Sequence, residues 1–201
     1  MTQTQHDAGW YLFDYGMVIA AAPAAGDWDR LEQTAGRELR APGSTYWAHR
    51  HSFDAGALDS PLYWSAVLER PVEPAEAENL DRLDTALWSQ PDPRTREVLR
   101  SLESRGASMA VLSNMPARMS QIFEAEGWWT GYFEHLIFSG PLRLAKPDPR
   151  IYEHALATMG AEASDVVFID DKRENIDAAA ALGLETVHYT ADTDLAAELG
   201  L

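Results

Sequence analysis

The chain alternates between short apolar runs and longer segments with helical spacing. Its first apolar run covers Trp10–Phe13 and ends at Asp14, with Gly16 shortly behind. Later apolar runs cover residues 109–112, 136–138 and 166–169, and a more polar segment that is also predicted to be a strand covers residues 185–189. Runs of about four to eight apolar residues that stop at a turn are typical of buried parallel strands. Each of these runs is therefore predicted to be a strand of one sheet.

Helices are predicted between the strands. They cover residues 94–103, 117–126, 149–159 and 173–182, and a glycine follows closely behind each of them. Glycine is favoured there because it adopts the left-handed backbone conformation that ends many helices. A terminal helix is expected after the last strand, with Thr190 or Asp192 as its cap. Strands that alternate with helices of about ten residues indicate a parallel sheet with right-handed crossovers.

Residues 27–89 have a different character. Helical spacing dominates there, no strand-like run is present, and Asp59-Ser60-Pro61 has the sequence of a helix start. The predicted fold class is therefore α/β, with a Rossmann-like parallel sheet core and an α-helical domain inserted after the first strand. The core is expected to cover residues 1–21 and 91–201, and the helical domain residues 22–90.

Composition narrows the class of protein. The chain has 201 residues, 46% hydrophobic and 24% charged, which are ordinary values for a globular protein. It contains no cysteine, which excludes disulfides, thiolate metal ligands and a cysteine nucleophile. The net charge of −16 opposes binding to nucleic acid or to an anionic membrane. Because residues 1–6 are polar and no apolar stretch reaches the ~18 residues that span a bilayer, a cytoplasmic location is expected.

Polar side chains follow the predicted strands at four places. They are Asp14, Ser113-Asn114, Lys146 and Asp170-Asp171. The carboxyl ends of parallel strands form one edge of a sheet, so these side chains are expected to converge. The three aspartates offer the hard oxygen ligands that Mg²⁺ prefers. The Ser113 hydroxyl and the backbone near Asn114 would donate to a phosphate, and Lys146 would add a compact positive charge.

This set of side chains fits the hydrolysis of a phosphate ester. Asp14 would attack phosphorus and form an aspartyl-phosphate, which water then hydrolyses. Mg²⁺, the expected cofactor, would shield the attacking carboxylate from the charge of the phosphate. The expected partner is a small-molecule phosphate ester, and the oligomeric state, monomer or homodimer, stays open.

The order of these motifs resembles the haloacid dehalogenase superfamily. The matching stretches are Phe13–Val18, Val111–Asn114, Lys146–Tyr152 and Phe168–Asn175. The first is similar to the Asp-Leu-Gly-x-Val variant of sugar-phosphatase-like members, such as the α-glucose-1-phosphatases and the phosphatase domain of soluble epoxide hydrolases. The resemblance covers nearly all of the predicted core and is weaker over the helical domain, which occupies the place of this family's small helical cap.

The resemblance implies a role for each matching residue. Asp14 would be the nucleophile and a metal ligand, and Gly16 would offer its backbone carbonyl to the metal. Asp171, and Asp170 with it, would complete the metal site. Ser113 and Lys146 would hold the phosphate. The substrate would be a small phosphorylated metabolite, such as a sugar phosphate.

One position departs from the family pattern. Most phosphatases of this superfamily have a second aspartate two residues after the nucleophile, where it is the general acid and base, but this chain has Gly16. Loss of such a group costs roughly 10²–10⁴-fold in rate. Two alternatives follow, a 2-haloacid dehalogenase with Asp14 as its nucleophile and a binding-only member of the family. A phospho-acceptor receiver domain is disfavoured, because receivers place their acidic pair after the first strand.

The helical domain carries the residues expected to set specificity. Trp47, His49 and Arg50 would contact the substrate, with Trp47 against a sugar face. Alternatively, the aromatic residues of this domain, Tyr63 and Trp64 included, form the core of a small helical bundle while the basic residues face solvent. The pair Trp128-Trp129 is expected either to pack in the core or to form an exposed patch.

Overall fold

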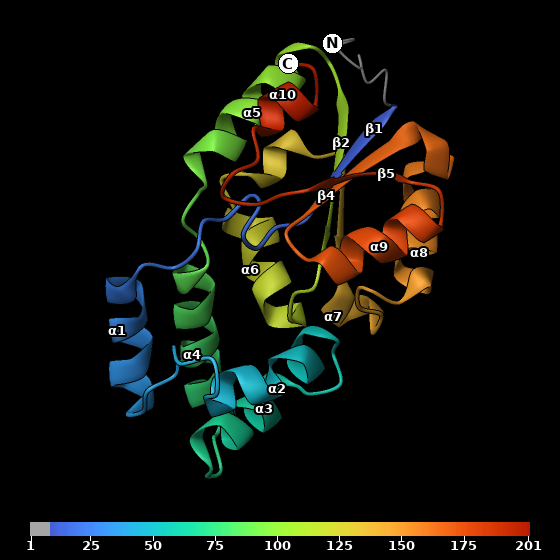
Figure 1. Ribbon diagram of the computed structural model, residues 1–201. Helices are drawn as coiled ribbons and strands as arrows, with labels where there is room; N and C mark the ends of the chain where they lie inside the picture. The colour runs from blue at the N-terminus through green and yellow to red at the C-terminus, as the bar shows by residue number, and fades with distance from the viewer. Residues whose placement is uncertain (1–8) are drawn as a thin grey trace.

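A five-stranded parallel sheet forms the centre of the protein (Figure 1). The computed structural model describes residues 9–201. The strand order is β3-β2-β1-β4-β5, with β1 in the middle. The strands are β1 (Trp10–Phe13), β2 (Ser108–Ser113), β3 (His135–Phe138), β4 (Val166–Asp170) and β5 (Glu185–His188). Phe13 lies opposite Val111 of β2 and Ile169 of β4, so the carboxyl ends of the three central strands lie side by side.

Helices cover both faces of the sheet, because alternate strand residues point to opposite sides. Tyr11 and Phe13 of β1 belong to one buried apolar cluster and Leu12 to another. The first cluster is covered by α5 (Pro93–Ser104), α6 (Ala117–Glu126) and α10 (Leu195–Glu198), and the second by α8 (Pro149–Met159) and α9 (Arg173–Ala181). The predicted α/β fold with helices between parallel strands is confirmed.

The start of the last helix and three short helices differ from the prediction. The cap of α10 is Asp194, whose Oδ1 accepts a hydrogen bond of 3.1 Å from the backbone of Ala197. Thr190 and Asp192, the predicted caps, lie too early, because the Thr190 hydroxyl closes a turn with Thr193 and with the backbone of Asp192. The short helices η1 (Thr130–Tyr132), α7 (Ser139–Leu142) and η2 (Ala163–Asp165) were not predicted, since none of them is long enough to show a helical period.

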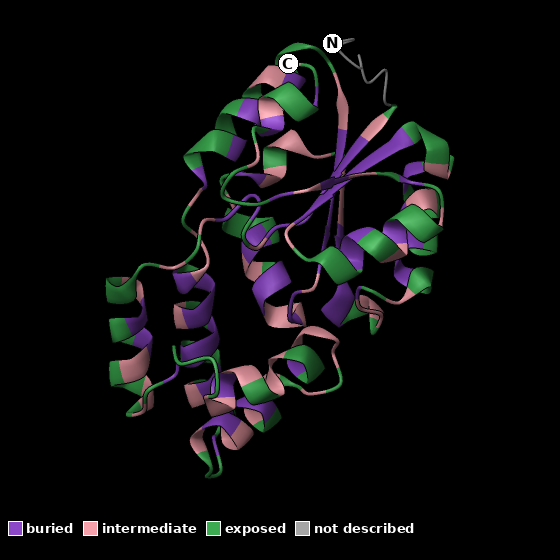
Figure 2. Cartoon of the chain, in the orientation of Figure 1, coloured by how far each residue is buried: buried purple, intermediate pink, exposed green. Residues whose placement is uncertain are grey.

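Four helices lie between β1 and the rest of the core, and we call them the helical insertion (Figure 1). They are α1 (Ala25–Ala35), α2 (Thr45–Asp54), α3 (Ser60–Leu68) and α4 (Pro74–Leu87). The insertion has an apolar core of its own, in which Tyr63 and Trp64 are fully buried. Figure 2 shows buried residues along the inner sides of these helices. Residues 27–89 contain no strand, as predicted.

The two tryptophans after α6 have different environments. Trp129 is fully buried against Tyr15 and Phe123. Trp128 is exposed, and the Arg96 guanidinium lies 5.2 Å from its ring centre. Among residues 9–201, no helix is both long and apolar enough to cross a membrane. Residues 1–6, on which the expectation of a cytoplasmic location partly rests, lie outside the described residues.

The helical insertion docks on the core beside the carboxyl ends of the strands. The Ser139 hydroxyl of α7 donates a hydrogen bond to the backbone carbonyl of Asp54, the last residue of α2. Gly56 follows with a φ of +70°, and a Cβ at this position would lie 2.3 Å from the carbonyl oxygen of Gly140. A second contact between the helical insertion and the core is made by α4, which packs against α6. The backbone at Gly56 therefore approaches the core too closely for any side chain.

Gly56→Ala is expected to lower the free energy of unfolding by about 2 kcal/mol, because the new methyl group both clashes with Gly140 and strains a left-handed backbone. Urea denaturation measures the change. Gly43→Ala is the matched control, since a Cβ there meets no atom within 4 Å and no left-handed φ is involved. Equal stability of the two variants would contradict the close docking of α2 on α7.

Candidate active site

Asp14 lies at the carboxyl end of the central strand. Its backbone N–H donates to the carbonyl of Ile169 at 2.8 Å, which continues the pairing of β1 with β4. One carboxylate oxygen, Oδ1, accepts hydrogen bonds from the Tyr15 backbone at 2.6 Å and from the Lys146 ammonium at 2.9 Å. The side chain is buried apart from its contact with the cavity described below. Strand pairing and these two donors together fix the orientation of the carboxylate.

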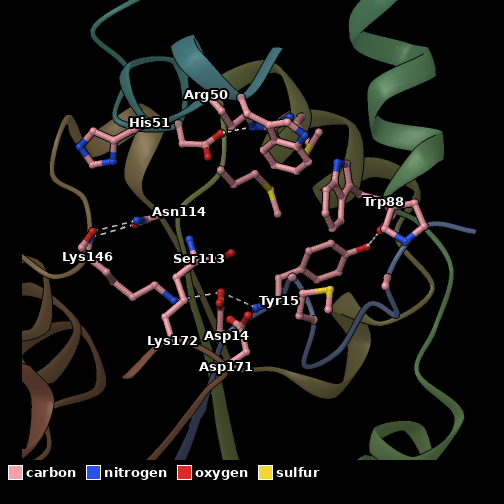
Figure 3. A pocket seen from close by; sticks show the side chains of 18 of the residues that line it. Asp14, Tyr15, Arg50, His51, Trp88, Ser113, Asn114, Lys146, Asp171 and Lys172 are labelled. Carbon is pink, nitrogen blue, oxygen red and sulfur yellow. Dashed lines mark hydrogen bonds and ion pairs between the residues drawn. The ribbon is translucent and has the colours of Figure 1, made fainter. Parts of the chain in front are cut away.

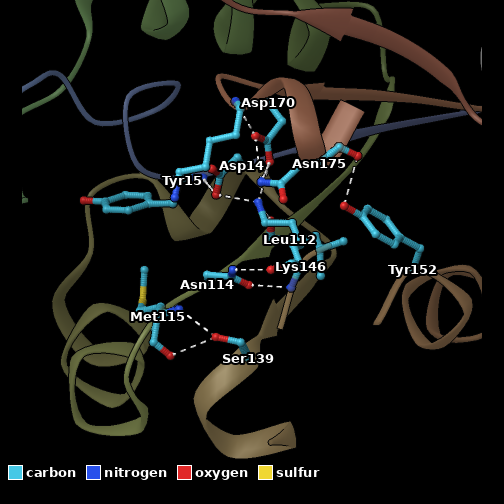
Figure 4. A network of polar contacts seen from close by, with 11 residues as sticks. Asp14, Tyr15, Leu112, Asn114, Met115, Ser139, Lys146, Tyr152, Asp170 and Asn175 are labelled. Carbon is cyan, nitrogen blue, oxygen red and sulfur yellow. Dashed lines mark hydrogen bonds and ion pairs between the residues drawn. The ribbon is translucent and has the colours of Figure 1, made fainter. Parts of the chain in front are cut away.

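Lys146 is buried between two aspartates (Figure 4). Its Nζ lies 2.9 Å from Asp14 Oδ1 and 2.6 Å from Asp170 Oδ2, and it also donates to the carbonyl of Leu112 at 2.8 Å. Burial alone would lower the pKa of Lys146, but the charges of Asp14 and Asp170 outweigh it and raise the pKa. The ammonium therefore stays charged at any physiological pH.

The Asn114 side chain fixes the loop that carries Lys146. Its Nδ2 donates to the carbonyl of Lys146 at 2.9 Å, and its Oδ1 accepts from the backbone N–H of Lys146 at 2.8 Å. Ser113 precedes it at the end of β2 and is also buried against the cavity. Ser113 and Asn114 therefore have different roles. The Ser113 hydroxyl lies beside Asp14, and the Asn114 amide positions Lys146 (Figure 3).

The two aspartates after β4 are not equivalent. Asp170 is fully buried, and its oxygens accept from Lys146, from the backbone of Lys172 and from the Asn175 amide. Asp171 is half-buried and lines the cavity. Burial, reinforced by the charges of Asp14 and Asp170, raises the pKa of Asp171 to about 6. Asp170 is thus committed to protein donors, whereas Asp171 is open to a ligand.

The three aspartates form a cluster with the spacing of a divalent-cation site. One carboxylate oxygen from each of Asp14, Asp170 and Asp171 lies within 4.8 Å of the others. Burial, opposed by the charge of Lys146 and reinforced by that of Asp170, raises the pKa of Asp14. Buried like charges of this kind are relieved by a cation, and hard carboxylate oxygens are what Mg²⁺ prefers. The donor set therefore fits the predicted metal.

A cavity of about 590 Å³ lies in front of these residues, between the strand ends and the helical insertion (Figure 3). Asp14, Gly16, Ser113, Asn114, Lys146 and Asp171 all line it. A Cβ at Gly16 would meet no atom within 4 Å, so the glycine is not required by the packing. The sequence placed these residues at one edge of the sheet, and the structure brings them together around one cavity.

The helical insertion contributes some of the predicted residues to the cavity. Trp47 and Arg50 line it, whereas His49 is not among the lining residues. Arg50 is engaged inside the insertion, where Nε binds Asp54 at 2.7 Å and Nη1 binds Asp84 at 2.9 Å. The aromatic pair Tyr63-Trp64 belongs to the core of the insertion, which confirms the bundle-core interpretation for these two residues.

Sequence reasoning missed several lining residues. They include Tyr15, Met17, Trp28, Arg40, Asp54, Trp88, Met115, Met119 and Lys172, whereas His51 belongs to the stretch 47–51 in which the histidines were expected to contact the substrate. Asp54 could have been predicted from helical spacing, because it falls on the same face of α2 as Trp47 and Arg50. Asp54 stands out among them, since burial, opposed by Arg50, raises its pKa to about 6.

Comparison with known proteins identifies the family. The sequence model of the family described as haloacid dehalogenase-like hydrolase matches residues 16–183. The chain belongs to this hydrolase family. A sesquiterpene phosphatase of Aspergillus oryzae is 34% identical over 102 residues, which make up 50% of this chain and 52% of that protein. An (S)-2-haloacid dehalogenase of a Pseudomonas species is 29% identical over 118 residues, which make up 58% of this chain and 50% of that protein.

The solved structure of a hydrolase-family enzyme from Bacteroides thetaiotaomicron, in complex with magnesium and inorganic phosphate, has the same fold. It superimposes with a TM-score of 0.71 at 17% identity, covering 92% of this chain and 96% of the other. The chain spans about half the length of the curated relatives described above. Family membership as a haloacid dehalogenase-like hydrolase therefore rests on the sequence match, and the structural likeness supports the fold.

Mg²⁺ is expected to stabilise this hydrolase through Asp171. At about 100 times its dissociation constant, a ligand that binds only the folded state adds roughly 2.7 kcal/mol. Asp171→Asn should lose most of this gain without losing stability in the absence of metal, because burial already disfavours the charged form of Asp171. Thermal unfolding with and without Mg²⁺ measures both effects.

Asp177→Asn on α9 is the matched control, since Asp177 is exposed and does not line the cavity. Its response to Mg²⁺ should equal that of the unmodified chain. An undiminished response in Asp171→Asn would contradict the assignment of a metal site to this aspartate.

Proposed function

We propose that this chain is a Mg²⁺-dependent phosphate monoester hydrolase with Asp14 as its nucleophile. The observation that carries the proposal is the cluster of Asp14, Asp170 and Asp171 around the buried Lys146. A phosphate group brings further negative charge to this cluster. Attack by the Asp14 carboxylate therefore needs two cations beside it, the Lys146 ammonium and the proposed Mg²⁺. Two relatives support the same chemistry: one is named a phosphatase, and one solved structure contains magnesium and inorganic phosphate.

In the proposed reaction, an oxygen of Asp14 forms a bond to phosphorus while the bond between phosphorus and the alcohol oxygen breaks. Water then attacks phosphorus of the aspartyl-phosphate, which releases inorganic phosphate and restores the carboxylate. Lys146 and the Ser113 hydroxyl bind the phosphate oxygens. When bound to Asp14 and Asp171, Mg²⁺ would shield the attacking carboxylate from phosphate charge. Asp170 acts indirectly, by orienting Lys146.

The alcohol needs a proton as it leaves, and Gly16 cannot supply one. The carboxylates that line the cavity within residues 9–201 are Asp14, Asp54 and Asp171. With Asp14 and Asp171 assigned to attack and metal binding, Asp54 is left for proton transfer. Its Oδ1 accepts from Arg50, and its pKa is raised to about 6, so that it carries a proton at mildly acidic pH. We therefore assign the general acid and base to Asp54.

The division of the chain follows from this proposal. Residues 1–21 and 91–201 would be the catalytic core, and residues 22–90 the cap that covers it. A dehalogenase is the second candidate function, because a named haloacid dehalogenase is among the relatives. The acidic cluster disfavours it, since attack on the carbon of a haloacid does not need a cation held by two further carboxylates, Asp170 and Asp171, beside the nucleophile. A cytoplasmic location stays a prediction from the sequence.

Hydrolysis of p-nitrophenyl phosphate tests the proposed reaction. Activity should require Mg²⁺, disappear with EDTA and fall at least about 10³-fold in Asp14→Asn, because the amide cannot attack phosphorus. 2-Chloropropionate is assayed in parallel by chloride release. Chloride release without phosphatase activity would support the dehalogenase instead, and binding of Mg²⁺ without either activity would support the binding-only member.

Asp54→Asn should lower kcat for an alkyl phosphate by about 10²–10⁴-fold, because an aliphatic alcohol leaves poorly without a proton. In the unmodified chain, kcat/KM should fall as the pH rises above about 6, where Asp54 loses its proton, and Asp54→Asn should lose this limb of the pH profile. Gly16→Asp should restore much of the rate to Asp54→Asn, since there is open space for the side chain. Two results together would contradict the assignment of Asp54 as general acid. Asp54→Asn would keep the fall in kcat/KM above about pH 6 that the unmodified chain shows, and the folded double variant Gly16→Asp/Asp54→Asn would be as slow as Asp54→Asn.

A further inference from the structure

Three tryptophans and three methionines line the cavity in front of Asp14. These are Met17, Trp28, Trp47, Trp88, Met115 and Met119. They come from four separate parts of the chain: the loop after β1, the helical insertion, the loop after β2, and α6. At about 590 Å³, the cavity falls within the range that holds ligands of the size of drugs. A phosphate with a two-carbon acid would leave most of this space filled by water.

Two of the three tryptophans of this wall have their indole N–H paired within the protein. Trp47 Nε1 donates to the carbonyl of Arg40 at 3.3 Å, and Trp88 Nε1 donates to the Tyr46 hydroxyl at 3.1 Å. The Tyr15 hydroxyl donates to the carbonyl of Trp88 at 2.7 Å. What these side chains present to the cavity is therefore ring surface rather than hydrogen-bond donors.

The two arginines that line the cavity are paired as well. Arg50 binds Asp54 and Asp84, and Arg40 binds Asp29 and Glu32. Recognition of sugar hydroxyls needs free donors and acceptors in fixed positions, because each buried hydroxyl left without a partner costs binding free energy. A wall with its donors already occupied is unsuited to that task.

His51 and Asn114 lie across the cavity from the aromatic side chains of Tyr15 and Trp88. Figure 3 shows these two sides, with Asp14 at the base. A ligand with its phosphate at Asp14 can therefore extend its other end along the aromatic side. The cavity has a polar end, where the reaction would occur, and an apolar wall beside it.

Met17 points to the same kind of ligand. It is one of the few large apolar side chains that are exposed, at 42%, and its φ of +62° is a left-handed conformation that a methionine adopts only at a cost. Its side chain lines the cavity three positions after the nucleophile. Core packing explains neither the exposure nor the conformation, whereas an apolar ligand would cover the thioether.

We propose that the substrate is the monophosphate ester of an apolar alcohol, a hydrocarbon chain or ring system, and not of a sugar. The inference rests on the proposed function, and it replaces the expectation of a sugar phosphate. The phosphate binds at Asp14, Ser113 and Lys146, and the hydrocarbon lies against Met17, Trp47 and Trp88. The driving force for specificity is burial of apolar surface, with no hydroxyl to be recognised.

A homologous series of substrates tests this proposal on the unmodified chain. Initial rates with Mg²⁺ are measured for ethyl, butyl, octyl and dodecyl phosphate, and for glucose 6-phosphate and 2-phosphoglycolate. The value of kcat/KM should rise roughly two- to fourfold for each added methylene until the hydrocarbon fills the cavity. Octyl phosphate should exceed glucose 6-phosphate by at least about 100-fold on the same scale.

A pair of variants locates the effect in the cavity. Trp47→Ser should lower the ratio of kcat/KM for octyl phosphate to that for ethyl phosphate at least about tenfold, because it removes ring surface from the apolar wall. Trp128→Ser is the matched control, since Trp128 is exposed outside the cavity and should leave the ratio unchanged. An unchanged ratio in folded Trp47→Ser would overturn the assignment of the wall.

The failure of this inference differs from the failure of the proposed function. Hydrolysis of ethyl phosphate and glucose 6-phosphate, without a gain from longer chains, would overturn the apolar substrate and leave the phosphatase intact. If no ester is hydrolysed, the proposed phosphatase activity is overturned. Calorimetric titration with n-alkylphosphonates of increasing chain length would then test whether the cavity binds apolar chains. Affinity that rises with chain length, with a negative heat-capacity change, would support apolar recognition. Affinity independent of chain length would overturn it.

Discussion

The buried ammonium of Lys146 is the interaction on which the candidate site depends. Two carboxylates brought together at the ends of β1 and β4 would repel each other in a medium of low dielectric constant. Lys146 lies between them, within 2.9 Å of Asp14 and 2.6 Å of Asp170. Because breaking such a buried pair leaves an uncompensated charge, each member constrains the other two. The site is therefore rigid at its base before any ligand arrives, and Asn114 extends this rigidity to the loop that carries the lysine.

Much of this base could be predicted from the sequence. Asp14, Ser113, Asp170 and Asp171 each follow an apolar strand, and parallel strands place their carboxyl ends together, so convergence needed no knowledge of side-chain contacts. The difference between Asp170 and Asp171 could not be predicted in this way. It depends on which carboxylate meets the donors of Lys146 and Asn175, and those donors come from positions that local pattern does not connect.

The wall contributed by the helical insertion was predicted only in part, for a related physical reason. Trp47 and Arg50 were recognised by residue type, but the pairing of Arg50 with Asp84 depends on how α2 packs against α4. That pairing changes what Arg50 offers to a ligand, because a guanidinium bound to carboxylates has few donors left. Periodicity shows which residues share a helix face. It does not show which hydrogen-bond or ion-pair partner each polar side chain has.

The position of Asp54 links the chemistry to the docking of the helical insertion. The proposed acid is the last residue of α2 in the helical insertion, and the nucleophile belongs to the core. The backbone carbonyl of Asp54 accepts from Ser139 of the core, so the same contact that docks α2 also fixes the carboxylate over the cavity. A substrate with an apolar alcohol would add to this arrangement, because hydrocarbon packed between Met17 of the core and Trp47 of the insertion favours the docked state. Asp54 would then transfer its proton inside a cavity from which the hydrocarbon excludes water.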